Sequence, residues 1–169
     1  MKRKALAITL AAAMAMGTYA VTASAADGDK YTIGICQLVQ HEALDAATQG
    51  FKDEVTKELG EDAVTFDEQN AQGDSNTCST IINSFVSNNV DLILANATPA
   101  LQAAQAGTSE IPILGTSVTE YGVALGIDGF DGTVGGNISG TSDLAPLTEQ
   151  AAMLNELFPD AKNVGLLYC

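Results

Sequence analysis

The sequence is short of positive charge. Its 169 residues include 7 Lys and Arg against 21 Asp and Glu, which gives a formal net charge of −14. A chain this acidic repels the phosphates of DNA and RNA, so we expect no nucleic-acid partner. We attribute the acidity to solubility.

Residues that bind metals or build disulfide frameworks are also scarce. There is one histidine, His41, and there are three distant cysteines, Cys36, Cys78 and Cys169. Their spacing matches no zinc motif, and three cysteines are too few for a disulfide framework. We expect Cys36 and Cys78 to be buried thiols, and a bridge between them in an oxidising compartment is the less favoured alternative. We predict no metal and no other cofactor.

Motifs of covalent catalysis are missing as well. The sequence has no Gly-x-Ser-x-Gly elbow and no paired carboxylates. The segment 126–140, GIDGFDGTVGGNISG, has six glycines but no P-loop lysine, and it does not follow the first predicted strand. We therefore expect a flexible surface connection rather than a phosphate cradle. The sequence does not support an enzyme.

An export signal opens the chain. A basic segment, Lys2 to Lys4, precedes an almost wholly apolar run, Ala5 to Met16, and an Ala-x-Ala site ends at Ala25. Together these predict a cleaved signal peptide over residues 1–25, whose apolar core is short for a membrane span. No cysteine follows the apolar run to serve as a lipid attachment site. We expect a periplasmic or extracellular protein.

Strands and helices alternate after the signal. Short apolar runs predict strands at residues 31–36, 63–66, 91–95, 111–114 and 123–127. Apolar residues three and four apart predict helices at 42–59, with Ala43, Ala47, Phe51, Val55 and Leu59 on one face, and at 75–88, 99–106 and 147–158. This order is typical of an α/β fold, a parallel sheet with helices on both faces.

Two of these helices have clear start signals. Asp74 is expected to cap the helix 75–88, whose apolar face is Ile81, Ile82, Phe85 and Val86. Thr98 is expected to cap the next helix, with Pro99 as its first residue.

Loops at the carboxyl ends of parallel strands are the usual binding positions. They are expected at 37–41, 69–74, 96–99 and 116–120. The helix start at Thr98 suits a carboxylate, or Thr98 only caps its helix. Thr116, Ser117 and Thr119 either line a cleft or solvate a turn. His41 either caps a helix or contacts ligand, and Asp143 either pairs with an ammonium group or caps a turn.

The last part of the chain starts something new. A helix at 147–158, a turn and a strand at 164–169 follow the first five strands, and the chain stops on an apolar run. A strand with nothing to pair against is a poor terminus. We expect a fragment, with residues 26–143 as one lobe and 144–169 as the beginning of a second.

A family resemblance covers most of this region. The stretches that carry it are, in order, YTIGICQLVQHEALDAATQGFKDEV, QNAQGD, VDLILANATPALQAA, IPILGTSVTE, GGNISGTSD and EQAAMLNELFPDAKNVGLLY. They resemble the substrate-binding proteins of ABC uptake transporters whose studied members take aromatic amino acids. The resemblance implies two α/β lobes of the type I periplasmic-binding-protein-like kind, in a chain about twice this long.

The resemblance also implies a function and a site. The protein would capture a small amino acid, with an aromatic one expected, between its lobes and deliver it to a membrane permease. The matching positions are Gln37, His41, Asn70, Gln72, Thr98, Pro99, Thr116, Ser117, Thr119, Ser142 and Asp143. Departures at Gln40, Glu120 and Tyr121-Gly122 bear on the preferred ligand side chain.

Three other readings stay open at this point. The chain could bind another small solute, such as a sugar or a branched-chain amino acid. It could be the ligand-binding domain of a membrane sensor. An exported flavodoxin-like enzyme would need a nucleophile or metal set that the sequence does not show.

Overall fold

The computed structural model describes residues 30–165. The predicted signal peptide lies outside them, as does the predicted strand 164–169 apart from its first two residues, which have no regular structure. Within the described residues the elements are, in order, β1 (Tyr31–Gln37), α1 (Glu42–Leu59), a short 3-10 helix (Glu61–Ala63), β2 (Val64–Asn70), α2 (Ser75–Ser87), β3 (Leu92–Asn96), α3 (Thr98–Gly107), β4 (Ile113–Val118), α4 (Tyr121–Leu125), β5 (Ile138–Ser142) and α5 (Leu147–Leu157). Over this part of the chain, no helix combines the length and the apolarity that a membrane span needs.

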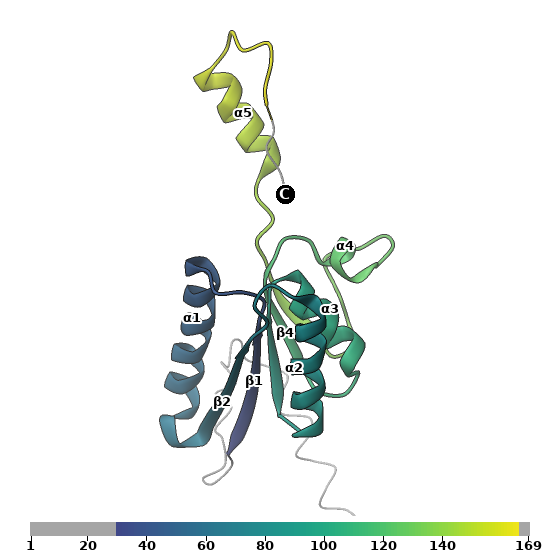
Figure 1. Ribbon diagram of the computed structural model, residues 1–169. Coiled ribbons are helices and arrows are strands. Elements are labelled where there is room, and N and C mark those ends of the chain that lie inside the picture. The colour runs from purple at the N-terminus through teal and green to yellow at the C-terminus, as the bar shows by residue number, and fades with distance from the viewer. Residues whose placement is uncertain (1–29, 166–169) are drawn as a thin grey trace, which may run out of the picture.

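The strands form one parallel sheet in the order β2-β1-β3-β4-β5. Helix α1 lies on one face of the sheet, and α2 and α3 lie on the other (Figure 1). This confirms the predicted α/β class with helices on both faces.

Each face of the sheet has its own apolar core. On the α2 and α3 face, Cys78, Ile81, Ile82 and Phe85 of α2 are buried, as their helical spacing predicts, and Val86 packs at the margin. On the α1 face, Phe51 and Val55 pack against buried β-strand residues. The prediction for α1 is wrong at its start, because Ala43 is exposed and Thr48 is the buried residue of the helix.

Two helix starts agree with simple capping chemistry and a third does not. Asp74 caps α2, where its carboxylate accepts a hydrogen bond of 2.7 Å from the Thr77 N–H. His41 caps α1, where Nδ1 accepts from the Ala43 N–H at 3.2 Å. Thr98 does not cap α3: it is the first helical residue, and the cap position belongs to Ala97, whose side chain cannot accept. The strand before it, β3, ends at Asn96, one residue later than predicted. The Ala97 N–H donates to the Thr116 carbonyl at 3.0 Å, which holds Ala97 at the strand end, and the helix begins directly after it at Thr98.

Two strands extend further than their apolar runs. β2 continues through polar residues to Asn70, because all seven of its residues pair with β1 and its other side is an open sheet edge. β4 begins at Ile113 rather than Ile111 and runs to Val118, so Thr116 and Ser117 belong to a strand and not to a loop. Pairing with β3 and β5 supplies the backbone partners that this hydroxyl-rich stretch needs.

The predicted strand at 123–127 is wrong. Residues 121–125 form the short helix α4, because the Glu120 carboxylate accepts hydrogen bonds from the N–H groups of Gly122 and Val123. Gly126, with φ of 67°, ends it in the left-handed conformation. The fifth strand is instead Ile138–Ser142, so the end of the glycine-rich segment belongs to the sheet and only its earlier part is a connection.

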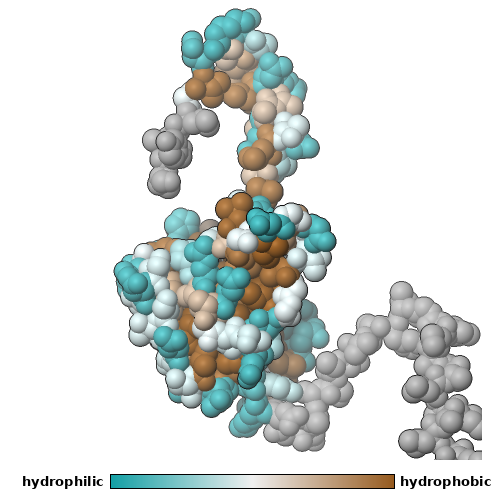
Figure 2. Space-filling view, turned by 90° about the vertical axis from the view of Figure 1, so that its right-hand side faces the viewer, coloured by the Kyte–Doolittle hydropathy of each residue, from teal (hydrophilic) through white to brown (hydrophobic). Residues whose placement is uncertain are grey.

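Helix α5 stands apart from the sheet (Figure 1). None of its residues is buried, and its exposed apolar side chains include Leu147, Met153 and Leu157. Apolar surface is visible along this helix and on the body below it (Figure 2). The described residues thus leave the apolar side of α5 without a partner.

Candidate functional site at the carboxyl edge of the sheet

The predicted site residues lie at one edge of the sheet, where the parallel strands end. In register, Asn70 of β2 pairs with Gln37 of β1, and Gln37 pairs with Asn96 of β3. Asn96 pairs with Thr116 of β4. These four polar side chains form a row across the ends of four neighbouring strands, which we call the polar row.

Buried amide side chains beneath this edge join the ends of β1 and β3 to α1. Thr48 donates a hydrogen bond of 2.7 Å from Oγ1 to Oε1 of Gln37, and Asn96 donates one of 2.9 Å from Nδ2 to Thr48 Oγ1. Asn96 Nδ2 also donates to the Leu44 carbonyl at 2.9 Å. The Gln37 Nε2 group donates to Asp45 Oδ1 at 2.6 Å and to the Val39 carbonyl at 3.0 Å. The ends of β1 and β3 are therefore fixed to the first turns of α1.

This network changes how Gln37 is understood. Gln37 is only 4% exposed, and both ends of its amide bond to protein groups. It lies beneath the edge and positions the loop that follows it.

Asn96 is a residue of this edge that the sequence did not single out as a site residue. It is fully buried, and its Oδ1 has no hydrogen-bond donor among residues 30–165. The sequence signal that could have identified Asn96 was a polar residue at the end of an otherwise apolar strand.

The loops after β1 and β2 are joined to each other. In the segment Asn70–Asp74, NAQGD, the Asn70 side-chain Oδ1 accepts from the Gln72 N–H at 2.8 Å. The N–H of Gly73 donates to the Leu38 carbonyl at 2.8 Å. Hydrogen bonds from Thr77 hold the pKa of the Asp74 carboxyl below its usual value. The hydrogen bonds of Asn70 and Gly73 fix the turn with Gln72 exposed at its tip.

The start of α3 is open for an anion. Thr98 and Pro99 are half-buried in its first turn, and no side chain caps the helix. Within residues 30–165 the Thr98 hydroxyl makes no hydrogen bond. Unpaired N–H groups at a helix N-terminus attract carboxylates and phosphates.

Strained backbone gathers at this edge. Three of the four non-glycine residues with positive φ among residues 30–165 lie near the carboxyl ends of β2, β3 and β4: Gln72 at 55°, Ala97 at 90° and Ser117 at 54°. Ala97, with ψ of 158°, occupies a region that is almost reserved for glycine. Such conformations concentrate at ligand sites, where the surrounding structure holds them in place.

The remaining predicted residues lie after β4 and β5. The Ser142 hydroxyl donates to the Thr119 carbonyl at 2.7 Å, and the Asp143 N–H donates to the Val118 carbonyl at 3.0 Å. The side chains of Thr119, Ser142 and Asp143 are exposed, whereas Ser117 is half-buried. The structure thus brings all the predicted residues to one edge, with Gln37 below it and His41 at the start of α1.

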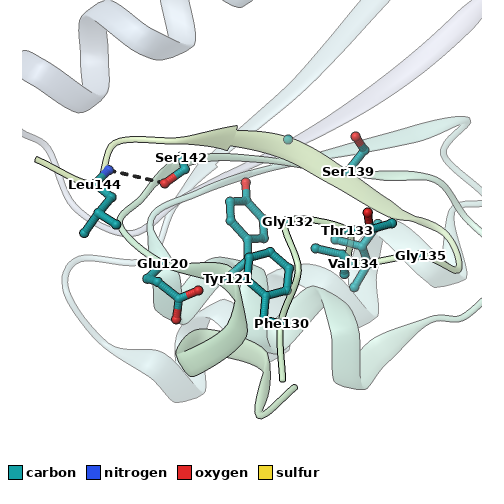
Figure 3. A pocket seen from close by; sticks show the side chains of 12 residues that line it. Glu120, Tyr121, Phe130, Gly132, Thr133, Val134, Gly135, Ser139, Ser142 and Leu144 are labelled. Carbon is teal, nitrogen blue, oxygen red and sulfur yellow. Dashed lines mark hydrogen bonds between the residues drawn. The ribbon is translucent and has the colours of Figure 1, made fainter. Parts of the chain in front are cut away.

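A hollow of about 620 Å³ lies to the side of this edge, between α4, β5 and the glycine-rich segment. Tyr121 and Phe130 line it with their rings (Figure 3). The Tyr121 hydroxyl donates to the Thr141 carbonyl at 3.2 Å, and burial, followed by the nearby Asp143 carboxylate, raises its pKa. Ser142 is the one predicted site residue among those that line this hollow.

Over the described part of the chain, no group of three His, Cys, Asp or Glu could hold a metal ion.

The family is decided by a model match over nearly the whole of this region. The family model for ABC transporter substrate binding proteins matches residues 32–169. The chain belongs to this family.

Individual relatives agree. A tyrosine-binding protein from Clostridioides difficile (strain R20291) is 41% identical over 140 residues, which cover 80% of this chain and 40% of that protein. A ligand-free, open substrate-binding protein with adhesive properties from Clostridium difficile has a TM-score of 0.69 at 41% identity, covering 78% of this chain and 45% of that one. A Streptococcus domain in complex with L-Trp has a TM-score of 0.71 at 30% identity over the same shares. The chain therefore spans less than half the length of these relatives.

Proposed function

We propose that this chain is the first lobe of an extracytoplasmic ABC substrate-binding protein that captures an aromatic amino acid and passes it unchanged to a membrane permease. The observation that carries the proposal is the polar row at the carboxyl edge of the sheet, in a chain of this family. Open α/β sheets bind ligands at this edge.

The two charged ends of an amino acid have complementary partners here. The uncapped start of α3 at Thr98 and Pro99, with the hydroxyls of Thr116, Ser117 and Thr119, would receive the carboxylate. The exposed carboxylate of Asp143 would receive the ammonium group.

The loops after β1 and β2 would then border the ligand side chain. Asn70, Gln72 and His41 stand on that side of the edge, and Gln37 holds the loop that leads to His41. The aromatic preference is supported by the two relatives that are described with tyrosine and L-Trp.

Capture needs a second surface. We assign residues 26–143 to the first lobe and 144–169 to the beginning of the second, in line with the exposed apolar face of α5 and with relatives more than twice as long as the matched region. A ligand that touches both lobes stabilises the closed form by a hinge motion.

Calorimetry on the protein that includes this chain and its second lobe tests the proposal. L-Tyr, L-Trp and L-Phe should bind with dissociation constants of about 1 μM or below, and glucose and L-Leu should bind at least about 100-fold more weakly. Preference for glucose or L-Leu would contradict the aromatic assignment. A stop codon directly after Cys169 would contradict the two-lobe assignment.

Replacement of Thr98 tests the carboxylate site within that experiment. Thr98→Ala should weaken binding more than about tenfold, because it removes a hydroxyl from the mouth of the site. Thr98→Ser keeps the hydroxyl and should retain most of the affinity, and Thr80→Ala, on the exposed side of α2, should change nothing. An unchanged dissociation constant for Thr98→Ala would remove the carboxylate assignment.

A further inference from the structure

Two cysteines that are far apart in the sequence come together between β1 and α2. Cys36 is the penultimate residue of β1, and Cys78 lies in the first turns of α2. Both are 0% exposed and belong to the same core cluster. The proposed ligand site uses neither of them.

Close packing of the helix on the strand explains how they meet. Gly34 lies two residues before Cys36, on the same face of β1. A Cβ atom at Gly34 would lie 2.6 Å from the ring of Phe85, so the absence of a side chain lets α2 lie directly on the strand. Phe85 and Cys78 are seven residues apart and share the buried face of α2. Ala95, the register neighbour of Cys36 in β3, leaves further room beside the thiol.

The two thiols interact in the folded protein. Burial raises the pKa of Cys36, and its contact with the Cys78 thiol raises it further. Burial is also the main cause of the raised pKa of Cys78. Because the thiolate is the reactive form, the packed pair is protected from reagents in solution. A bond between them would therefore form while α2 docks on β1, when the two sulfur atoms are already aligned but the surrounding core is not yet closed.

We propose that Cys36 and Cys78 form an intramolecular disulfide when the protein folds outside the cytoplasm. Disulfides persist in such compartments, and the substrate-binding proteins of this family work there. The oxidant is a protein or small-molecule disulfide. Cys36 and Cys78 together give up two protons and two electrons as their S–S bond forms, and the oxidant is reduced to two thiols.

The bond would join the two loops that border the proposed site. Cys36 directly precedes Gln37, and α2 directly follows the NAQGD segment. The disulfide would add a covalent link to the hydrogen bonds between these loops. The inference depends on export and on the β1–α2 contact and does not depend on which ligand binds.

Mass spectrometry of the exported full-length protein tests it. A Cys169→Ser background leaves Cys36 and Cys78 as the two cysteines of residues 1–169. After denaturation without reductant, both should resist iodoacetamide, and the intact mass should be about 2 Da below that of the reduced protein. Digestion should release one peptide pair that contains both residues, and reductant should separate it. Full alkylation of both thiols, even after refolding with oxidised and reduced glutathione, would overturn the proposal, as would pairing between two molecules.

A displaced thiol provides the matched control. Cys78→Ala combined with Ser79→Cys moves the sulfur to the neighbouring exposed position of α2. Refolded with the same glutathione mixture, this variant should keep Cys36 alkylatable after denaturation, because the new thiol faces away from β1. Equal cross-linking in both proteins would show that the β1–α2 contact does not select the pair and would overturn the inference.

Discussion

The two halves of the carboxyl edge are held in different ways. At the ends of β1 and β3, buried amides join the strands to α1, and backbone hydrogen bonds join the loops after β1 and β2. At the ends of β4 and β5, the side-chain hydrogen bonds are separate from one another. The Ser142 bond to the Thr119 carbonyl is exposed, the Tyr121 bond to the Thr141 carbonyl is part-buried, and the one between the Thr141 and Thr116 hydroxyls is long, at 3.4 Å. The first half is a preformed surface, which lowers the entropy lost on binding. The second half is open to completion by ligand or by a second lobe.

Backbone proximity is what holds the second half. Gly115 and Gly140 are register partners in β4 and β5. A Cβ atom at Gly140 would collide with the Gly115 carbonyl and with the Tyr121 hydroxyl. The strands and the Tyr121 ring therefore pack where side chains are absent, and among residues 30–165 no buried side-chain network joins this half of the edge.

Removal of Asn96 should be the most damaging single change to the first half. Asn96→Ala leaves the Leu44 carbonyl and the Thr48 hydroxyl without a donor in a buried position, which should cost about 3 kcal/mol of unfolding free energy. Urea denaturation measures it. Asn83→Ala, at an exposed position of α2, is the control and should cost less than about 0.5 kcal/mol. Equal small losses for both variants would mean that the network does not hold this half.

Substitutions in the second half should destabilise the folded protein by overpacking rather than by loss of hydrogen bonds. Gly140→Ala places a methyl group against the Gly115 carbonyl and Tyr121, and should cost about 2 kcal/mol. Ser139→Ala, one residue earlier and exposed, should stay within about 0.5 kcal/mol of the unsubstituted protein. Tolerance of Gly140→Ala in the same denaturation experiment would show that β5 can move away from β4.

Replacement of Thr48 tests whether the first half behaves as a unit. Thr48→Val keeps the shape but removes a hydroxyl that links Gln37 to Asn96, and should cost about 1.5 kcal/mol. Combined with Asn96→Ala, its effect should fall short of the sum by about 0.5 kcal/mol or more, since the two residues share a bond. Thr56→Val, two turns further along α1, is the control. Strict additivity would mean that the amides act independently.

The fold was largely predictable because its strong signals are local. Apolar spacing located α1 and α2 almost to the residue, and Asp74 marked the start of α2. Errors arose where a helix cap or tertiary pairing outweighed the apolar pattern. The apolar run from Val123 to Ile127 is typical of a strand, but the Glu120 carboxylate caps a short helix there. Polar residues of β2 and β4 are in strands because their neighbours supply the hydrogen bonds.

The position of the candidate residues in the fold could be derived from the sequence, whereas the contacts that support them could not. The rule that ligands bind beyond parallel strand ends selected Asn70, Thr98 and Thr116, and the structure has all three at the carboxyl edge of the sheet. The roles of Thr48 and Asn96 depend on how α1 lies across β1 and β3, and no local pattern encodes that packing. Thr98 shows the same limit, since a good capping residue proved to be already inside the helix.

The smallest expected effect concerns the charge at the start of α2. Hydrogen bonds from Thr77 lower the pKa of Asp74 below its ordinary value of 3.8, so the folded state favours the carboxylate. Its stabilisation is therefore present above pH 3.8 and is lost as the pH falls through the lower folded-state pKa. Asp74→Asn keeps a good cap without the charge, and should lower the melting temperature slightly at pH 7 but not near pH 2.

Thermal melts of the unsubstituted protein and of Asp74→Asn between about pH 2 and pH 7 sharpen the comparison between the two halves. Asp128→Asn, which removes an exposed acid from the glycine-rich segment, controls for the change in net charge. If Asp74→Asn and Asp128→Asn gave the same pH profile, the effect would be general electrostatics. The expected outcome is a loss of melting temperature that is confined to Asp74→Asn and disappears at low pH. The contact involved is a single carboxylate that accepts from the first turn of α2. This result would therefore show that specific hydrogen bonds hold the first half even where it is exposed.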